Sequence, residues 1–388
     1  MIDTSILLIL TLSLLIWGSP FMAKFLRLPI PTVEIILGSL FAYFGLIGEN
    51  QYFNLIAEVG FLYLMFLAGM EVDLKQITRS SRTILRQSML FLLIMASFSI
   101  GAGLLFGLNA IIIISMPLIS IGLLASLSKT YGKEEPWIKL AFIAGILGEI
   151  ISIAVLTIYD AAITTGLTFE LLEKIGYLSA FMFTVYILYR LLHLLFWWFP
   201  ELKSTLVPKF DTSDQDIRLA MALFFILITV MLALHLELAL GSFIAGVAIS
   251  AFFHHEKALE MKMSSLGFGF LVPLFFIHVG ASFDIRSLAV EGVVTGALLI
   301  TFLMILARIL AAFALKHISG SRNALLVGLS LSMPLTLLVA VATIGYETKL
   351  LDLISYYQLI LASIFEILIV MATIKILQSK QTKEDHAS

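Results

Sequence analysis

The chain has 388 residues, of which 60% are hydrophobic and 13% are charged, and its formal net charge is −2. This composition excludes the common classes of soluble domain, and the small net charge gives no reason to expect a nucleic acid partner. The sequence contains no cysteine, which excludes disulfide bonds and thiolate metal sites.

The apolar residues are gathered in blocks whose length matches a helix that crosses a hydrocarbon core about 30 Å thick. We therefore predict an all-α, polytopic membrane protein with about thirteen transmembrane helices. The first block lacks the basic segment and cleavage site of a signal peptide, so we expect it to be retained. In chain order, the predicted spans are residues 5–23, 30–47, 53–70, 84–106, 110–128, 138–159, 172–198, 217–234, 237–253, 265–282, 288–315, 323–345 and 353–377.

The basic residues are distributed unevenly between the two sets of alternate connections. Of the 24 Lys and Arg residues, 20 lie in one set, and the other set holds only Lys174, Arg286 and Lys349. The remaining one, Arg308, lies inside a predicted span. Because cytoplasmic loops carry the positive excess, we expect a multi-pass protein of the cell inner (plasma) membrane with its N-terminus outside and its C-terminus in the cytoplasm.

Short sequence matches recur in the same order in the two halves of the chain, on either side of a polar linker near residues 199–216. The matches are Leu37-Gly38-Ser39 with Leu240-Gly241-Ser242, Gly69 and Asp73 with Gly280 and Asp284, Ser115-Met116-Pro117-Leu118 with Ser332-Met333-Pro334-Leu335, and Gly148-Glu149-Ile150 with Phe365-Glu366-Ile367. Corresponding spans are seven apart, which is an odd number, so the second copy runs through the membrane in the opposite sense. We predict two inverted six-helix repeats, residues 1–165 (spans one to six) and 211–388 (spans eight to thirteen), joined by span seven and a cytoplasmic loop at 166–210.

The repeated Ser-Met-Pro-Leu motif predicts an interruption in spans five and twelve. Pro117 and Pro334 each remove a backbone donor inside an apolar segment, and the freed backbone groups need other partners in lipid. The hydroxyls of Ser115 and Ser332 are candidate partners for the backbone and for an ion. A simple proline kink explains either proline alone, but their matched positions favour two discontinuous helices that cross near the membrane centre.

Glu149 lies near the middle of predicted span six, where a carboxylate costs about 3 kcal/mol on insertion-based scales. Burial there favours the protonated form until a cation arrives, so proton and cation compete for one site. We therefore interpret Glu149 as the proton-binding and metal-ion-binding residue. The alternative is a neutral glutamate that is hydrogen-bonded between helices.

Arg308, Glu366 and His278 are the further ionisable residues of predicted spans for which a role is considered. Arg308 in span eleven could neutralise Glu149, pair with Glu366 or hold the carbonyls of the broken helices, and we favour an ion-pairing or scaffold role. Glu366, the repeat counterpart of Glu149, is either a second ion ligand or a charge partner. His278 in span ten could sense pH near neutrality, although a neutral, hydrogen-bonded histidine is the commoner case.

At these residues the chain resembles the monovalent cation:proton antiporter-2 family, whose members exchange Na⁺ or K⁺ for H⁺. The similar features are Pro31 to Gly38 with Glu34, the segment Gly69-Met70-Glu71-Val72-Asp73, the segment Pro273-Leu274-Phe275-Phe276, and Arg308. The resemblance implies a homodimer whose mobile core domain contains two crossed, broken helices. Where members usually carry Asp-Asp or Asn-Asp in span six, this chain has Gly148-Glu149, so a single carboxylate stands in place of the pair.

The function predicted from these features is secondary active exchange of a monovalent cation, Na⁺ or K⁺, for protons by alternating access. Two alternatives stay open at this point: a carrier of an organic anion or small solute on the same fold, and a non-transporting membrane receptor. An enzyme is not expected, because the sequence shows no cluster of metal ligands and no nucleophile with a paired base. We expect no cofactor beyond the transported ions.

Overall fold

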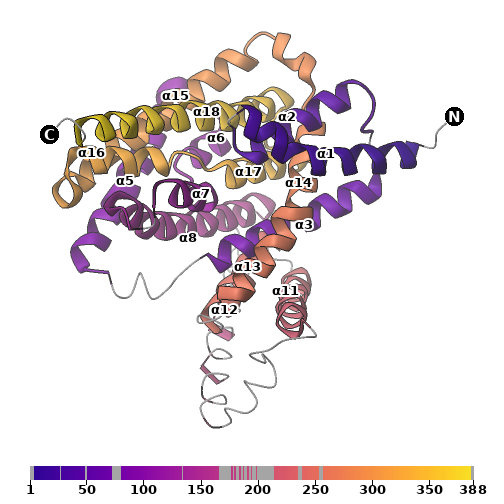
Figure 1. Cartoon of the computed structure of the whole chain (residues 1–388), viewed down its shortest axis with the longest axis horizontal. Helices are drawn as coiled ribbons and strands as arrows, with labels where there is room; N and C mark the ends of the chain where they lie inside the picture. The colour runs from indigo at the N-terminus through magenta and orange to yellow at the C-terminus, as the bar shows by residue number, and fades with distance from the viewer. Residues whose placement is uncertain are drawn as a thin grey trace. The chain divides into compact units, whose positions relative to one another are not determined.

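The computed structural model describes residues 4–26, 28–48, 50–71, 80–132, 134–165, 214–234, 238–252 and 257–385, together with scattered positions between 176 and 198. The regular structure of these residues is helical, which confirms the predicted all-α class (Figure 1). The helices are α1 (Thr4–Leu26), α2 (Ile30–Tyr43), α3 (Gln51–Met70), α5 (Arg82–Phe106), α6 (Ala110–Ser115), α7 (Gly122–Tyr131), α8 (Pro136–Thr165), α11 (Gln215–Ala233), α12 (Leu238–Phe252), α13 (Lys257–Leu266), α14 (Val272–Ala281), α15 (Val293–Ala312), α16 (Lys316–Ser330), α17 (Leu335–Glu347) and α18 (Leu353–Asp385). A π-helical segment, η1 (Gly267–Leu271), joins α13 to α14, and two 3-10 segments, η2 (Ile285–Ala289) and η3 (Phe313–Leu315), lie on either side of α15.

The described residues contain eight helical segments that are long and apolar enough to cross a membrane, and three shorter apolar helices accompany them. The chain is therefore a multi-pass membrane protein. The predicted span at 172–198 lies largely outside the described residues, as does most of the polar linker, so the count of thirteen stays a prediction. Predicted spans five and twelve are each interrupted rather than continuous, as the repeated motif indicated.

Polar side chains begin several of these helices, because the first backbone N–H groups of a helix have no partner within it. The Asn50 side chain accepts hydrogen bonds from the N–H groups of Tyr52 and Phe53 and begins α3. Asn109 accepts from the N–H of Ile111 in the same way and begins α6. Between their ends the apolar helices satisfy their own backbone, which is what the interior of a membrane requires.

The chain divides into two compact units that do not follow the predicted sequence repeats. Unit 1 comprises Met1–Glu49, Lys75–Ser152 and Phe276–Ser388, and unit 2 comprises Asn50–Leu74 and Ile153–Phe275. Each unit therefore draws helices from both halves of the chain. The division into residues 1–165, 166–210 and 211–388 is a different partition, and it stays a prediction.

In unit 2, α3 packs closely along α12 at two glycines. A Cβ atom at Gly69 would lie 2.1 Å from the carbonyl oxygen of Phe243, and one at Gly246 would lie 2.0 Å from the carbonyl oxygen of Phe66. Only glycine permits backbones to approach so closely. In each helix the glycine lies three residues after the carbonyl that the other helix's glycine faces.

In unit 1, α2 and α14 approach each other with the same geometry. A Cβ atom at Gly38 would lie 2.2 Å from the carbonyl oxygen of Ile277, and one at Gly280 would lie 2.0 Å from that of Ile35. The spacing is again three residues in each helix, and each crossing joins a helix of the first half to a helix of the second. The two crossings relate Gly38 to Gly246, five residues beyond the Gly241 of the sequence match, and the inverted repeats stay a prediction.

Candidate functional site

The first interruption lies in unit 1 between α6, which ends at Ser115, and α7, which begins at Gly122. The intervening segment, Met116–Ile121, contains Pro117 and continues as neither helix. Two of its backbone N–H groups are hydrogen-bonded: that of Leu118 donates to the Ser115 carbonyl at 3.2 Å, and that of Ile119 donates to the Ser152 hydroxyl at 3.1 Å. These bonds meet the need for partners that a broken helix creates inside a membrane protein.

The second interruption, Leu331–Pro334, separates α16 from α17, also in unit 1. The Ser332 N–H donates to the Leu329 carbonyl at 2.9 Å, and Pro334 is the residue from which α17 starts. Both interruptions thus contain the proline of the repeated motif. The same four-residue sequence is associated with a helix break in each half of the chain.

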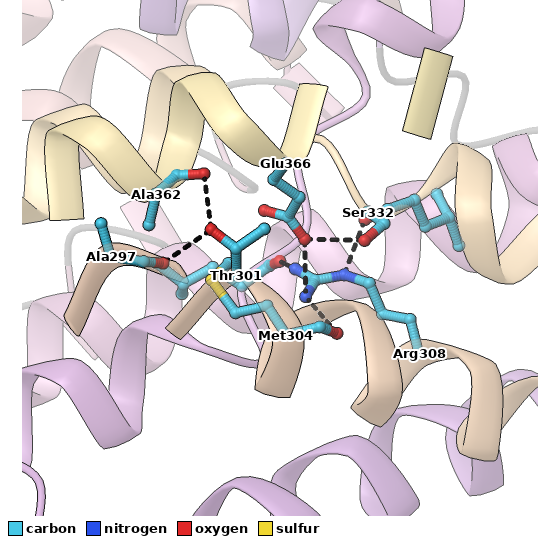
Figure 2. Close-up of polar contacts among 9 residues, drawn as sticks. Ala297, Thr301, Met304, Arg308, Ser332, Ala362 and Glu366 are labelled. Atoms are coloured by element: carbon cyan, nitrogen blue, oxygen red, sulfur yellow. Dashed lines mark hydrogen bonds and ion pairs between the residues drawn. The ribbon is translucent and has the colours of Figure 1, made fainter. Parts of the chain in front are cut away.

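The guanidinium of Arg308, on α15, connects the two interruptions. Its side chain is fully buried; Nη2 donates to the Leu118 carbonyl at 2.7 Å and Nε donates to the Leu331 carbonyl at 3.1 Å. Nη1 donates to the Met304 carbonyl, one turn back on α15, at 3.1 Å (Figure 2). One side chain therefore satisfies a carbonyl of each broken helix, and charge-assisted bonds of this kind are stronger than neutral ones.

Glu366, on α18, supplies the negative charge beside Arg308. Its Oε1 lies 3.3 Å from Arg308 Nη1 and accepts a hydrogen bond from the Ser332 hydroxyl at 2.7 Å (Figure 2). Its Oε2 is buried and accepts no hydrogen bond from the described residues. One turn away from Glu366, the Thr301 hydroxyl of α15 is shared between the Ala297 carbonyl of its own helix at 2.8 Å and the Ala362 carbonyl of α18 at 3.3 Å, and the second contact joins the same two helices (Figure 2).

The contacts of Arg308 distinguish among the roles that its sequence position suggested. Arg308 pairs with Glu366 and, at the same time, donates to carbonyls of both broken helices. A buried ion pair is weak evidence for stability by itself, but removal of one partner leaves an uncompensated buried charge. Arg308 and Glu366 therefore form a structural link whose two charges depend on each other.

Glu149, on α8, lies beside the first interruption. It is fully buried, and its Oε1 accepts a hydrogen bond from the Ser120 hydroxyl at 3.4 Å. The preceding residue, Gly148, packs directly on the interrupted segment, since a Cβ atom there would lie 2.5 Å from Cδ1 of Ile119. Carboxylate, hydroxyl and carbonyl oxygens are the ligands that hard cations prefer, so this corner has the chemistry to hold a proton or a small cation.

The other predicted site residues lie elsewhere. The Ser115 hydroxyl donates to the Ile112 carbonyl within α6 at 2.8 Å, so that contact caps its own helix. His278 lies on α14, and its carbonyl accepts a hydrogen bond from the Ser282 hydroxyl at 3.0 Å. Nothing in these contacts tests the pH-sensing role predicted for His278 or the ion-binding role predicted for the two serines.

Glu34, near the start of the predicted span 30–47, is buried although residues near span ends commonly reach water. Its side chain is only 2% exposed, and its Oε1 accepts a hydrogen bond from the Ser19 hydroxyl of α1 at 3.0 Å. The residue lies within the first turns of α2, whose residues from Thr32 to Ile35 are all buried. Glu34 is therefore shielded from solvent although it lies near the start of α2, because α1 covers that end of the helix.

Sequence reasoning missed two features of the first interruption. Neither the Ser120 hydroxyl as the donor to Glu149 nor Ser152 as the acceptor from Ile119 was predicted. A signal for Ser152 existed, because residues three apart on a helix lie on the same face and Ser152 follows Glu149 at that spacing. Within the described residues no group of three or more His, Asp or Glu could hold a metal ion, so ion binding at Glu149 stays a prediction.

Comparison with known proteins bears on the fold and the family. The sodium/hydrogen exchanger, transmembrane family matches residues 9–380. The chain is 26% identical to YjbQ of Bacillus subtilis (strain 168) over 91% of its own length, and it spans 60% of the length of that relative. It is 24% identical to the Na⁺/H⁺ antiporter of Enterococcus hirae, over 88% of this chain and 90% of that protein.

The solved structure of the sodium proton antiporter MjNhaP1 from Methanocaldococcus jannaschii has a similar fold. The two share 15% sequence identity with a TM-score of 0.68, and the similarity covers 96% of this chain and 97% of that one. These findings confirm the resemblance to cation:proton antiporters that the sequence motifs indicated. The chain belongs to the sodium/hydrogen exchanger, transmembrane family.

Proposed function

We propose that the chain exchanges a monovalent cation, Na⁺ or K⁺, for protons by alternating access, and that Glu149 carries the exchanged ion. The observation that supports this most directly is the burial of the Glu149 carboxylate beside an interrupted helix, with the Ser120 hydroxyl donating to it. Membership of the exchanger family supports the reaction class.

Exchange follows from the physical chemistry of a buried carboxylate. A charged carboxylate at the centre of a bilayer costs about 3 kcal/mol, so the group is either protonated or accompanied by a cation. Proton and cation then compete for the same oxygens, and a carrier that changes access only in the loaded states exchanges one for the other. With one such carboxylate in place of the usual pair, we expect one cation to move for each proton.

The proposal also covers the membrane location, the orientation and the oligomeric state of the protein. We place the protein in the cell inner (plasma) membrane with its N-terminus outside and its C-terminus in the cytoplasm, on the basis of the basic residues of its connections. The family resemblance suggests a homodimer. No cofactor is required, because the exchanged ions are the only reacting species.

Reconstitution in proteoliposomes tests the proposal. A pulse of NaCl or KCl should release protons from vesicles loaded at a fixed pH, and Glu149→Gln should abolish this movement because the amide holds neither ion. Glu291→Gln, an exposed position before α15, removes the same charge far from any proposed role and should exchange as the unmodified protein does. Proton movement that persists in Glu149→Gln would show that another group carries the ion.

The contacts of Arg308 weaken the alternative of an organic-anion carrier. The Arg308 guanidinium is the group that could bind the carboxylate of an organic anion, but it already donates to three carbonyls and pairs with Glu366. An anion at this place would displace bonds that hold the broken helices.

A further inference from the structure

We propose that Glu366 is a positioning residue for the ion site at Glu149, and that it acts through Arg308 on the interrupted segment Met116–Ile121. This inference rests on the proposed function of Glu149 and adds a second residue to it, from the opposite half of the chain. The link runs from α18 through α15 to the first interruption, all within unit 1.

The first step is the fixation of Arg308 by Glu366. Both side chains are fully buried, and the carboxylate accepts from Ser332 while it lies 3.3 Å from the guanidinium. Figure 2 shows the Glu366 carboxylate pointing toward the guanidinium of Arg308 and toward the Ser332 hydroxyl. A planar guanidinium with a fixed partner at Nη1 has a defined direction for its remaining donors.

The second step is the fixation of the interrupted segment by Arg308. Nη2 donates to the Leu118 carbonyl at 2.7 Å, the shortest of the three bonds from this guanidinium to carbonyls. Leu118 lies between α6 and α7, where the Leu118 N–H donates to Ser115 and the Ile119 N–H donates to Ser152. The donor from α15 adds the bond that fixes the Leu118 carbonyl.

The third step connects that backbone to the carboxylate. Ile119 follows Leu118, and its N–H donates to Ser152, three residues after Glu149 on α8. Ser120 comes next, and its hydroxyl donates to Glu149 at 3.4 Å. The Leu118 carbonyl and the Ile119 N–H belong to one planar peptide unit, so a shift of that carbonyl also moves the N–H that donates to Ser152 and the backbone that leads to Ser120.

The same geometry argues against Glu366 as a second carrier of the cation. Oε1 already faces the guanidinium and the Ser332 hydroxyl. A cation bound at this carboxylate would lie beside a buried positive charge, where repulsion is strongest. The two repeat-related glutamates thus have different tasks, one in ion exchange and one in placing the exchange site.

The test is a comparison of exchange kinetics in proteoliposomes. We expect Glu366→Gln to raise the apparent KM for the transported cation about tenfold, the factor expected for one weakened hydrogen bond at the site, and to keep a measurable maximal rate. Glu366→Asp retains the charge and should return the KM toward its original value. Glu291→Gln serves as the control for loss of an acidic residue.

Two outcomes would overturn the inference. If Glu366→Gln purifies folded and its KM is unchanged, the positioning role is wrong, while loss of exchange in Glu149→Gln would still support the proposed function. If folded Glu366→Gln has no exchange at any cation concentration, Glu366 carries the ion itself and the inference is overturned.

The paired variant Arg308→Gln with Glu366→Gln covers the case in which the single variant does not fold, because it removes both charges together. Its KM should equal that of Arg308→Gln alone, since Glu366 acts only through the guanidinium. An additional rise in KM in the paired variant would contradict this route. Exchange that survives Glu149→Gln would instead overturn the proposed function on which the inference rests.

Discussion

The two interrupted helices of unit 1 have related sequences, but they hold their buried glutamates differently. At the second interruption, Oε1 of Glu366 lies 3.3 Å from Nη1 of Arg308 and accepts a hydrogen bond from the Ser332 hydroxyl at 2.7 Å. At the first, Glu149 receives a hydroxyl at 3.4 Å, and the Arg308 that neutralises its counterpart contributes only a bond to the nearby backbone. The sequence repeat thus places two carboxylates at equivalent positions, while a single arginine makes them unequal.

Under the proposed function, this difference gives Glu366 a structural role and leaves Glu149 for ion exchange. A carboxylate with a permanent cationic partner cannot exchange that partner for Na⁺ or H⁺, because arginine never gives up its proton in a protein. It can, however, hold a broken helix in place. We expect the unequal pair to respond differently to matched substitutions.

The largest effect should follow the loss of the charge on Glu366. Glu366→Ala leaves Arg308 as a buried cation with no anion, which should destabilise the protein by about 3–5 kcal/mol. The measurement is the thermal unfolding of purified protein in detergent. A variant that replaces Arg308 and Glu366 together with neutral residues should recover most of this loss, and failure to recover it would show that the charges are not coupled.

Removal of one hydroxyl at each interruption provides a finer comparison. Ser332→Ala should destabilise the protein by about 1.5–3 kcal/mol, the range for a hydrogen bond to a charged group, because its bond to Glu366 is short. Ser120→Ala should cost less, since its bond to Glu149 is 3.4 Å long. Equal losses in the two unfolding midpoints would contradict the difference described between the two glutamates.

The close packing at Gly148 gives a third comparison. Gly148→Ala should destabilise by about 1–3 kcal/mol and reduce exchange, because its new methyl group would press on Ile119 and shift the first interruption. Gly101→Ala on α5 is the matched control, since a Cβ there has no neighbour within 4 Å. That variant should be as stable as the unmodified protein or slightly more stable, because alanine favours a helix.

The smallest effect is expected at Glu134, a solvent-exposed carboxylate before α8. The hydrogen bond and charge of Lys139 hold the pKa of Glu134 below its usual value of 4.5. A lowered pKa in the folded state adds stability above the usual pKa and loses it as the pH falls through the folded value. Glu134→Gln should therefore leave the pH dependence of unfolding and of exchange unchanged between roughly pH 6 and 8. A change in that range would show that the surface carboxylate Glu134, and not Glu149, causes the pH dependence.

The sequence by itself determined the all-α membrane class, the family resemblance and the positions of both helix interruptions. These follow from local rules: apolar segments of spanning length must be helical in lipid, and proline cannot continue a helix without losing a hydrogen bond. The separation of 217 residues between the matched motifs likewise placed Glu149 and Glu366 as counterparts before any contact was known.

Only the tertiary structure decided which glutamate Arg308 pairs with, that Glu34 is buried against α1, and that Ser120 rather than Ser115 donates to Glu149. The sequence left three partners open for Arg308, because a long side chain on α15 could reach any of them and span order does not say which helices meet. The partner depends on how α15 packs along α18, through contacts such as that of Thr301 with Ala362, between residues distant in the chain. Such pairings are determined by packing over the whole unit, and no local pattern encodes them.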